Sequence, residues 1–398
     1  MPTVKPTITV EVKLGASWTD VTADTQSVVQ PLDISYGITG AGPNDRIAST
    51  GTAQFALNNS SSNSTGNVGA YSPGHTNARA NWDIGALCRI SLTHGGTTFF
   101  KHVGTITSIV PDAGLYKRKS VQVTSVDWMD EAATAKVKGV PVTSGQRADQ
   151  LVEDLVTTAV TRQPQQTSYA TGISTFAFAF DNLKDTQTSV IQALKDVVMS
   201  ELGFLYVKGS TVSPGGVLRM ESRHSRPILS GASPSATFDD TMVGLDVSRA
   251  RGDVINTIYI VVHPRTVSAA TTNVLWELTT TEVQPSIPAG GTVDLHAMFT
   301  EASINAYRVG GQNFEAPVSG TDWIANTLAD GSGSVITGDV AMTIASPAAN
   351  AATLRFVNSG TVTAYLTTVQ IRGRTVKDVS ETVVSSSDST SQTSFGAL

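Results

Sequence analysis

Histidine is the residue type in this sequence best suited to binding a metal ion or transferring a proton. The chain has six of them, at His75, His94, His102, His224, His263 and His296. Only His94 and His102 share a neighbourhood, where they could meet across a hairpin, but no carboxylate stands near them to complete a metal site. We therefore predict that the histidines occupy solvated strand positions and that the chain has no metal-binding residue.

Acidic side chains offer a second kind of chemistry, because a glycosidase needs two carboxyl groups that face each other across a cleft. The sequence contains three adjacent acidic pairs, Asp130-Glu131, Glu153-Asp154 and Asp239-Asp240. Neighbouring residues on a strand point to opposite faces of a sheet, so Asp239 and Asp240 cannot supply that geometry alone. We predict that these carboxylates cap helices or remain solvated.

Two local motifs resemble functional sites without completing them. Residues 330–333 (DGSG) resemble part of a calcium loop, but the further acidic positions and the closing Glu of an EF-hand are missing, so we predict a turn. Cys88 is the only cysteine, which excludes an intramolecular disulfide and any CxxC site; we predict a small buried hydrophobe. The standard signatures of hydrolases, P-loops and zinc proteases do not occur. We predict no catalytic residue, no cofactor-binding residue, no cofactor and no enzymatic activity.

The composition favours a folded, β-rich chain of several domains. The 398 residues are 40% hydrophobic and 15% charged, which is enough apolar surface to form a core. The polar residues are mainly Ser, Thr, Asn and Gly, which favour strands and turns. The net charge of −6 and the scattered basic residues disfavour specific binding of nucleic acid, and the basic triplet at 117–119 is predicted to be a hairpin turn. No segment has the pattern of a signal peptide or a membrane span.

Large aromatic side chains could serve sugar binding, but their dispersion favours roles as core anchors. The tryptophans are Trp18, Trp82, Trp128, Trp276 and Trp323.

The first 139 residues have the pattern of an all-β domain. Ile8, Val10, Val12 and Leu14 alternate with polar residues, which is typical of a half-buried strand. Further strands are predicted up to residue 127. Residues 58–69 are almost entirely Asn, Ser, Thr and Gly, and we predict a mobile surface loop there.

Residues 140–236 change to a helical period and predict an α+β domain. Apolar residues at three- and four-residue spacing predict one helix over about 148–159, with Ser144 as its N-cap. A second helix is predicted over about 190–202, with Thr188 as N-cap and Gly203 as the terminating residue. Strands at 204–208 and 217–222 are predicted to pack against these helices.

The remaining sequence returns to a β pattern. Short strands are predicted from residue 237 onward, and residues 354–357 and 360–371 are predicted to form a hairpin around Asn358-Ser359-Gly360. The predicted fold class is therefore mainly β with a small α+β unit.

The order of motifs along the chain resembles the tail hub, or baseplate-hub-like, minor tail proteins of long-tailed bacteriophages. Residues 99–106 (FFKHVGTI), 114–116 (GLY) and 121–129 (VQVTSVDWM) resemble the strand, hairpin and D-x-M corner of that family. Residues 253–258 (DVINTI) resemble the strand that enters its second hub barrel, and 371–374 (IRGR) a closing segment. Chains of the family usually continue beyond the Phe-Gly at 395–396, whereas this sequence stops two residues later, so either the native chain is longer or this is a short member.

The resemblance implies two β-barrel-like hub domains, residues 1–139 and residues 237–275 with 364–398, the second of which is interrupted by an inserted β-sandwich at 276–363. It implies a structural role in the virion tail, after assembly in the cytoplasm of the bacterial host. It implies a homotrimeric hub that joins the tail tube, or a distal tail protein, to the tip and its fibres. It also implies contact with the tape-measure protein and transient passage of DNA without specific binding. The inserted sandwich is expected either to attach fibres or host surface glycans or to act as a spacer. The alternatives are a receptor-binding or adhesin β-sandwich protein and a component of the distal-tail ring.

Overall fold

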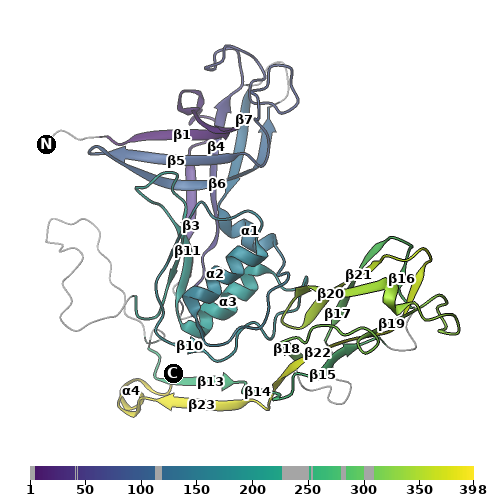
Figure 1. Ribbon diagram of the computed structural model, residues 1–398. Helices are drawn as coiled ribbons and strands as arrows, with labels where there is room; N and C mark the ends of the chain where they lie inside the picture. The colour runs from purple at the N-terminus through teal and green to yellow at the C-terminus, as the bar shows by residue number, and fades with distance from the viewer. Residues whose placement is uncertain are drawn as a thin grey trace. The chain divides into compact units, whose positions relative to one another are not determined.

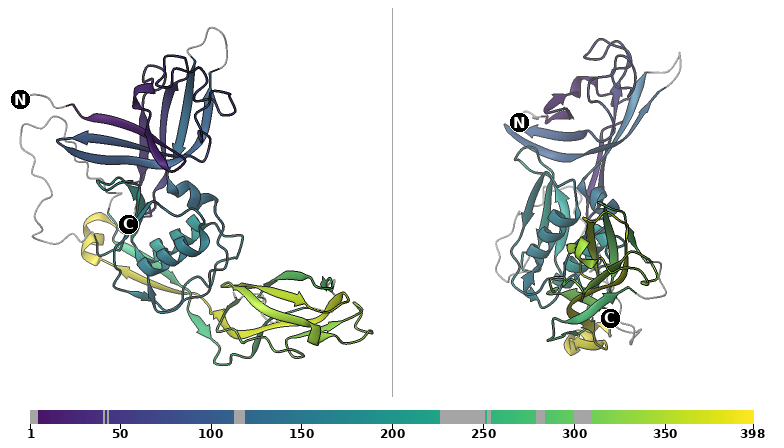
Figure 2. Two further views of the ribbon diagram at one scale, coloured as in Figure 1. Left: turned by 45° about the horizontal axis from the view of Figure 1, so that its top comes forward. Right: turned by 45° about the vertical axis from the view of Figure 1, so that its right-hand side comes forward.

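The structure of the protein is a computed structural model. Among the residues that it describes, 44% are in strands and four segments are α-helices, so the prediction of a mainly β chain is confirmed. The chain divides into two compact units (Figures 1 and 2). Unit 1 is residues 1–179 and 183–226, and unit 2 is residues 180–182 and 227–398. This division into two units does not test the boundaries of the four predicted domains. The structure describes residues 5–40, 42, 44–112, 119–225, 251, 254–278, 284–299 and 309–398.

Unit 1 contains a seven-stranded sheet in which every neighbouring pair is antiparallel. In spatial order its strands are β2 (Ser17–Asp20), β1 (Thr7–Leu14), β5 (Leu87–His94), β6 (Thr97–Pro111), β7 (Ser120–Val126), β4 (Ser49–Asn58) and β3 (Asp33–Gly37). One face carries a core that includes Val12, Phe55 and Ile106. The outer strands β2 and β3 are not paired with each other, and no sheet among the described residues closes into a barrel.

The segment at 58–69, predicted to be a mobile loop, is fastened by a buried carboxylate. Asp24 lies in the short 3-10 helix η1 (Thr22–Asp24) and accepts hydrogen bonds from the backbone N–H of Ser64 at 2.7 Å and from its hydroxyl at 2.6 Å. Asp24 also accepts from the Tyr71 hydroxyl, and the Tyr71 ring contacts Trp82 edge to face with 5.0 Å between centroids. The prediction of mobility is therefore not supported, because the polar residues of this segment satisfy one another.

Two helices of unit 1 form where the apolar period predicts them, α2 (Ala148–Ala159) and α3 (Val190–Glu201), and Figure 1 shows them side by side. A third helix, α1 (Trp128–Thr134), was not predicted and lies within the segment 1–139 that was expected to be all-β. These helices accompany a three-stranded sheet, β11-β12-β9, and a two-stranded one, β10-β8. These strands are β8 (Gln146–Arg147), β9 (Gln166–Tyr169), β10 (Thr175–Phe176), β11 (Phe204–Lys208) and β12 (Val217–Glu221).

The predicted helix ends need correction. The N-cap of α2 is Arg147 in place of Ser144, and its backbone N–H donates to the Gln150 side chain at 3.0 Å. The N-cap of α3 is Ser189, because the Thr188 hydroxyl is already engaged by the backbone N–H of Lys184. At the other end of α3 Leu202, with φ 55°, takes the left-handed conformation one residue before Gly203. Caps depend on local hydrogen-bond competition, which an apolar period does not reveal.

Unit 2 contains a β-sandwich built around one long strand. β22 (Ala364–Asp378) pairs antiparallel with five others, and a second sheet has the order β17-β21-β20. The partners of β22 are β14 (Arg265–Val267), β15 (Asn273–Glu277), β16 (Ser286–Ile287), β18 (Val309–Gln312) and β19 (Trp323–Asn326). The second sheet is formed by β17 (Thr292–Met298), β20 (Val340–Pro347) and β21 (Ala351–Asn358), and the 3-10 helix η3 (Thr337–Asp339) precedes β20.

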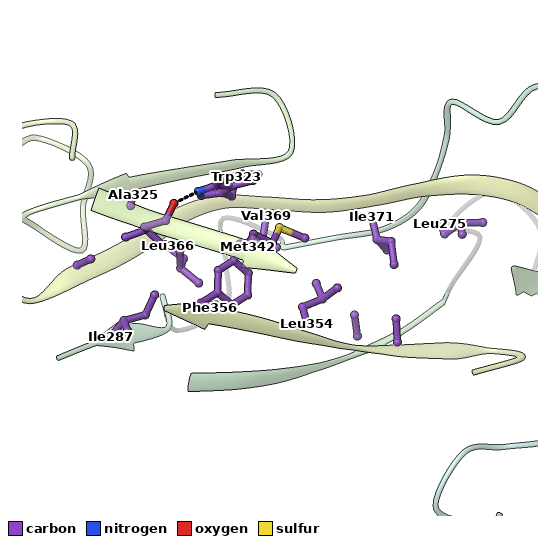
Figure 3. Packing of buried hydrophobic residues seen from close by; sticks show 14 of the residues in the cluster. Leu275, Ile287, Trp323, Ala325, Met342, Leu354, Phe356, Leu366, Val369 and Ile371 are labelled. Atoms are coloured by element: carbon purple, nitrogen blue, oxygen red, sulfur yellow. Dashed lines mark hydrogen bonds between the residues drawn. The ribbon is translucent and has the colours of Figure 1, made fainter. Parts of the chain in front are cut away.

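The core of the sandwich lies between these two sheets (Figure 3). Leu354 and Phe356 of β21 point into it, as do Leu366 and Val369 of β22. The Trp323 indole N–H donates to the carbonyl of Val340 at 3.0 Å and so ties β19 to β20 across the layers. The first half of β22, which the predicted boundaries place after the insert, is therefore part of this core.

The predicted hairpin around Asn358 is wrong, because β21 pairs with β17 and β20 while β22 belongs to the other sheet. The chain crosses between sheets here. Asn358 is buried, and its amide donates to the carbonyls of Ile287, Pro288 and Val362 at 3.1, 3.2 and 2.8 Å. The turn-like sequence at Asn358 therefore lies where the chain passes from one sheet to the other, and the Asn358 amide links three segments there.

The rest of unit 2 described here is a two-stranded ribbon and a short helix. β13 (Thr257–Val262) pairs antiparallel with β23 (Thr382–Ser387), and α4 (Ser389–Phe395) follows. The Asp388 side chain caps α4 by accepting from the backbone N–H groups of Thr390 and Ser391, each at 3.0 Å. The Ser-rich composition of residues 383–392 gave no signal for β23 or α4.

We expect Phe356→Ala to destabilise the sandwich by about 3–5 kcal/mol, because the side chain is fully buried and its removal leaves a cavity. Urea-dependent hydrogen exchange of the β20 and β21 amides measures this locally. Val357→Ala is the matched control, since Val357 is the next residue on the same strand and is exposed. Equal effects of the two substitutions would contradict the assigned core.

Candidate functional site

A pocket of about 490 Å³ lies within unit 1. Its walls come from β6, the end of β7, the first turn of α1 and the segment 162–165. Apolar groups such as Val103 and Trp128 line it together with Asp127, Asp130 and Glu131. We therefore take this pocket as the candidate functional site.

Hydrogen bonds from the Arg162 segment fix the walls of this pocket. The Trp128 indole N–H donates to the Arg162 carbonyl at 2.9 Å, and the Arg162 guanidinium donates to the Thr105 hydroxyl at 2.8 Å. Gly104 permits the close approach of β6 and β7, because a Cβ there would lie 2.2 Å from the Val126 carbonyl oxygen. The pocket is thus a consequence of how β6, β7 and α1 are joined.

Asp127 is one of the ionisable residues that line this pocket. It is the N-cap of α1, and its carboxylate accepts from the Met129 backbone N–H at 3.0 Å. Burial raises the pKa of this carboxyl to about 6, backbone hydrogen bonds from Gly51 and Met129 lower it, and the nearby charge of Asp130 raises it. Its oxygens are occupied as a helix cap, so the raised pKa has a structural origin.

His102 does not occupy the predicted solvated position. It is buried on β6, with Nε2 3.0 Å from the Ser125 hydroxyl, and burial lowers its pKa to about 4. In the register of β5 and β6, His102 lies opposite Ile90 whereas His94 lies opposite Thr97, so the strands keep the two histidines apart. No cluster of three His, Cys, Asp or Glu residues suited to a metal occurs among the described residues.

Cys88 is buried as predicted, in the core of the seven-stranded sheet. Burial raises the pKa of its thiol to about 12, and the charge of Glu11 adds to the shift. The Arg89 side chain on the same strand contacts the Trp18 ring at 4.3 Å and forms a bidentate ion pair with Glu11, at 2.6 and 2.8 Å. A thiol in this state is a packing group, because the nucleophilic form of cysteine is the thiolate.

The acidic pairs are not brought together. Asp130 and Glu131 lie in the first turn of α1 and line the pocket, while Glu153 and Asp154 lie on α2. The pair Asp239-Asp240 lies outside the described residues, as do Lys117 and Arg118 of the basic triplet. The predicted turn at Asp330 is present: the N–H and the hydroxyl of Ser332 donate to its carboxylate at 3.0 and 2.7 Å, and these bonds lower its pKa.

The tryptophans fit their predicted role as packing groups. Trp82, Trp128 and Trp323 are buried, and Trp276 packs against the sandwich core. No helix among the described residues is long and apolar enough to span a membrane.

Sequence reasoning missed Asp24 and Asp127, two of the buried carboxylates of unit 1. Asp127 carried a recognisable signal, since an Asp directly before the helix-forming residues 128–134 is a typical N-cap. Asp24 carried none, because its partners Ser64 and Tyr71 lie 40 and 47 residues away. Both carboxylates satisfy donors of the fold.

Comparisons with known proteins give only remote similarity. No protein-family profile matches the chain, and no curated protein sequence matches it. Among solved structures, a tail protein from Neisseria meningitidis MC58 is 12% identical, with 64% of each chain covered and a TM-score of 0.38. The 43 kDa tail protein of prophage MuSo2 from Shewanella oneidensis is 10% identical, with 54% of each chain covered and a TM-score of 0.33. The chain thus spans less than two thirds of each, and the similarity shows that tail proteins are among its structural neighbours and no more.

We expect Asp127→Asn to be more stable than the wild type at pH 7.5, by up to about 3 kcal/mol, with the advantage fading toward pH 4. The folded carboxyl has a pKa of about 6, above its unfolded value, so wild-type stability falls as pH rises between these values. Asparagine still caps the helix. Thermal melts across this range test the expectation, with Asp388→Asn as control because Asp388 is an exposed N-cap. A pH-independent loss of stability would contradict it.

The contribution of His102 to stability depends on pH in the opposite direction. Its folded pKa of about 4 lies below the unfolded value, so the unfolded chain takes up a proton first and stability falls as pH drops below about 6.5. His102→Gln, which retains a partner for Ser125, should remove a loss of about 2 kcal/mol between pH 7 and pH 5. Chemical denaturation at both pH values measures it, and His94→Gln at the exposed end of β5 is the control. An unchanged acid loss in His102→Gln would contradict the burial argument.

Proposed function

We propose that this chain is a structural protein of a bacteriophage tail, and that three copies form a hub joining the tail tube to the tip and its fibres. The observation that carries this proposal is the ribbon of β13 and β23 in unit 2, whose apolar side chains are exposed. A protein that leaves such a surface uncovered is built to assemble.

The ribbon cannot be explained as a self-sufficient element. A two-stranded ribbon is at best marginally stable alone in water. In this one Ile260 and Val384 lie opposite each other and are both more than half exposed, and Tyr259 of β13 is exposed as well. Burial of such side chains contributes about 1.5–3 kcal/mol each, so covering them provides a strong drive for association.

The assignment to a tail rests on the order of sequence motifs. The D-x-M corner at 127–129 lies at the junction of β7 and α1, where the resemblance expects the end of a strand. The tail-protein descriptions of the two structural neighbours agree with this assignment, although they are too distant to carry it. In this proposal the barrel-like hub domains are residues 1–139 and the pair 237–275 with 364–398.

The partners belong to the same proposal. The hub would contact the tail tube or distal tail protein, the tape-measure protein and tail fibres, and DNA would pass it without specific binding. A net charge of −6 suits such a passage, because a wall rich in Lys and Arg would hold the phosphate backbone. We propose no catalytic role, since the buried Asp127 and His102 are engaged in hydrogen bonds that hold the fold.

The second candidate function is host recognition by the sandwich. It is favoured by a loop that a buried polar side chain holds in place. Asn326 is buried, and its amide holds the carbonyls of Gly331 and Gly333 at 3.0 and 3.1 Å, so the loop at 328–335 is ordered. Leu328 and Val335 in this loop are exposed. Binding of the purified protein to a glycan array would support this candidate, and its absence would favour the spacer role.

We expect the purified protein to be a trimer by size-exclusion chromatography with light scattering, at micromolar concentration. Decoration of intact virions with an antibody against unit 2 should label the tail tip. A stable sixfold ring would contradict the hub and favour a distal-tail ring component.

A further inference from the structure

The ribbon of β13 and β23 lacks the usual protection of an edge strand. Its two strands supply twelve residues, TIYIVV and TVVSSS, and none of them is charged or proline. Natural proteins normally protect exposed strand edges with charges, prolines or bulges, because an unprotected edge pairs with other strands. A strand that pairs with this edge is therefore expected to carry uncharged, apolar side chains.

The two faces of the ribbon differ. Register partners share a face, so Ile258, Ile260 and Val262 lie on one face with Val384, which pairs with Ile260. The other face carries Tyr259 and Val261, and there the Gln392 side chain of α4 donates to the Thr257 hydroxyl at 2.8 Å. We call the first face the aliphatic face, and among the described residues no side chain of α4 hydrogen-bonds to it.

The ribbon also has two edges that no further strand covers among the described residues. There β13 pairs with β23 alone, and β23 with β13 alone. One backbone group at the end of β13 has another partner, since the Thr257 N–H donates to the Leu398 carbonyl at 3.1 Å. Beyond Thr257, the described part of each copy presents one free edge of β13 and one free edge of β23. Seven large apolar side chains, spread over both faces of the ribbon, are 41–71% exposed, and contiguous exposed apolar surface marks interaction sites.

We propose that the ribbon is the site at which copies of this chain join, by pairing the free β23 edge of one copy with the free β13 edge of the next. This inference rests on the trimer of the proposed function and specifies its interface. Because β13 and β23 run antiparallel, this pairing keeps every ribbon in the same orientation while the strands alternate in direction, so three ribbons close into a six-stranded antiparallel barrel. Closure removes every edge, which an open head-to-tail chain of copies does not.

A second copy is the occupant that the chemistry favours. Its strand carries the same uncharged residues, so neither surface has to desolvate a charge on pairing. The interior of so small a barrel holds side chains only. The aliphatic face supplies them from Ile258, Ile260, Val262 and Val384, and it leaves the face that α4 contacts on the outside.

Val384→Lys tests this proposal, because it places a charge on the aliphatic face. We expect it to weaken trimer formation at least tenfold by light scattering across a dilution series. Val110→Lys is the matched control: Val110 lies on β6, and it is 56% exposed where Val384 is 54% exposed. Val384→Thr, which keeps the β-branched shape, should weaken the trimer less than the lysine variant does.

Hydrogen exchange of the wild-type ribbon provides a readout that needs no variant. The β13 and β23 amides should be protected in the trimer and exchange rapidly after dilution to monomer. A trimer that persists unchanged in Val384→Lys, with its ribbon amides unprotected, would overturn the interface and leave the trimeric hub standing. A wild-type monomer at all concentrations would overturn the hub itself, and protected ribbon amides in that monomer would show that one chain covers its own ribbon.

Discussion

Backbone hydrogen bonding along two long strands is the constraint on which both units depend. β6 in unit 1 and β22 in unit 2 are each 15 residues long, against a usual strand length of about five or six. A strand of about 50 Å has more donors and acceptors than one neighbour can satisfy. β22 therefore takes five partners, and β6 pairs with β5 on one side and β7 on the other. Register shifts at Ile90/Ser91, Ile106/Ser108 and Ile324/Ala325 accommodate the twist that such lengths accumulate.

Local sequence patterns were sufficient to predict the helices and strands whose stabilising contacts lie nearby in the chain. The helical period at 148–159 and 190–201 and the strands at 204–208 and 217–221 follow from apolar residues that face a nearby partner. The crossing at Asn358 could not be predicted in this way, because a turn within one sheet and a passage between two sheets use the same residue types. Packing between residues far apart in the sequence determines which strand pairs with which, and the residues near a strand do not reveal its partner.

The polar residues of the candidate site show the same division. An N-cap such as Asp127 is readable because its partner, the N–H of Met129, is two residues away. The burial of His102 is not readable, because it results from β6 packing inside the sheet and from Ser125 on the neighbouring strand. Both residues have pKa values displaced by burial, and in both the displaced group satisfies a donor or acceptor of the fold. Displaced pKa values mark functional sites only when the group is free to act on something else.

The burial of Cys88 has a practical consequence for labelling the molecule. Burial raises the pKa of its thiol far above pH 7, so the reactive thiolate is disfavoured, and the side chain lies inside the sheet. A cysteine introduced at an exposed position would therefore be the single reactive thiol in a native background. Fluorophores or spin labels could be attached at one chosen residue per chain, and distances between labels on different copies could then be measured in assembled particles.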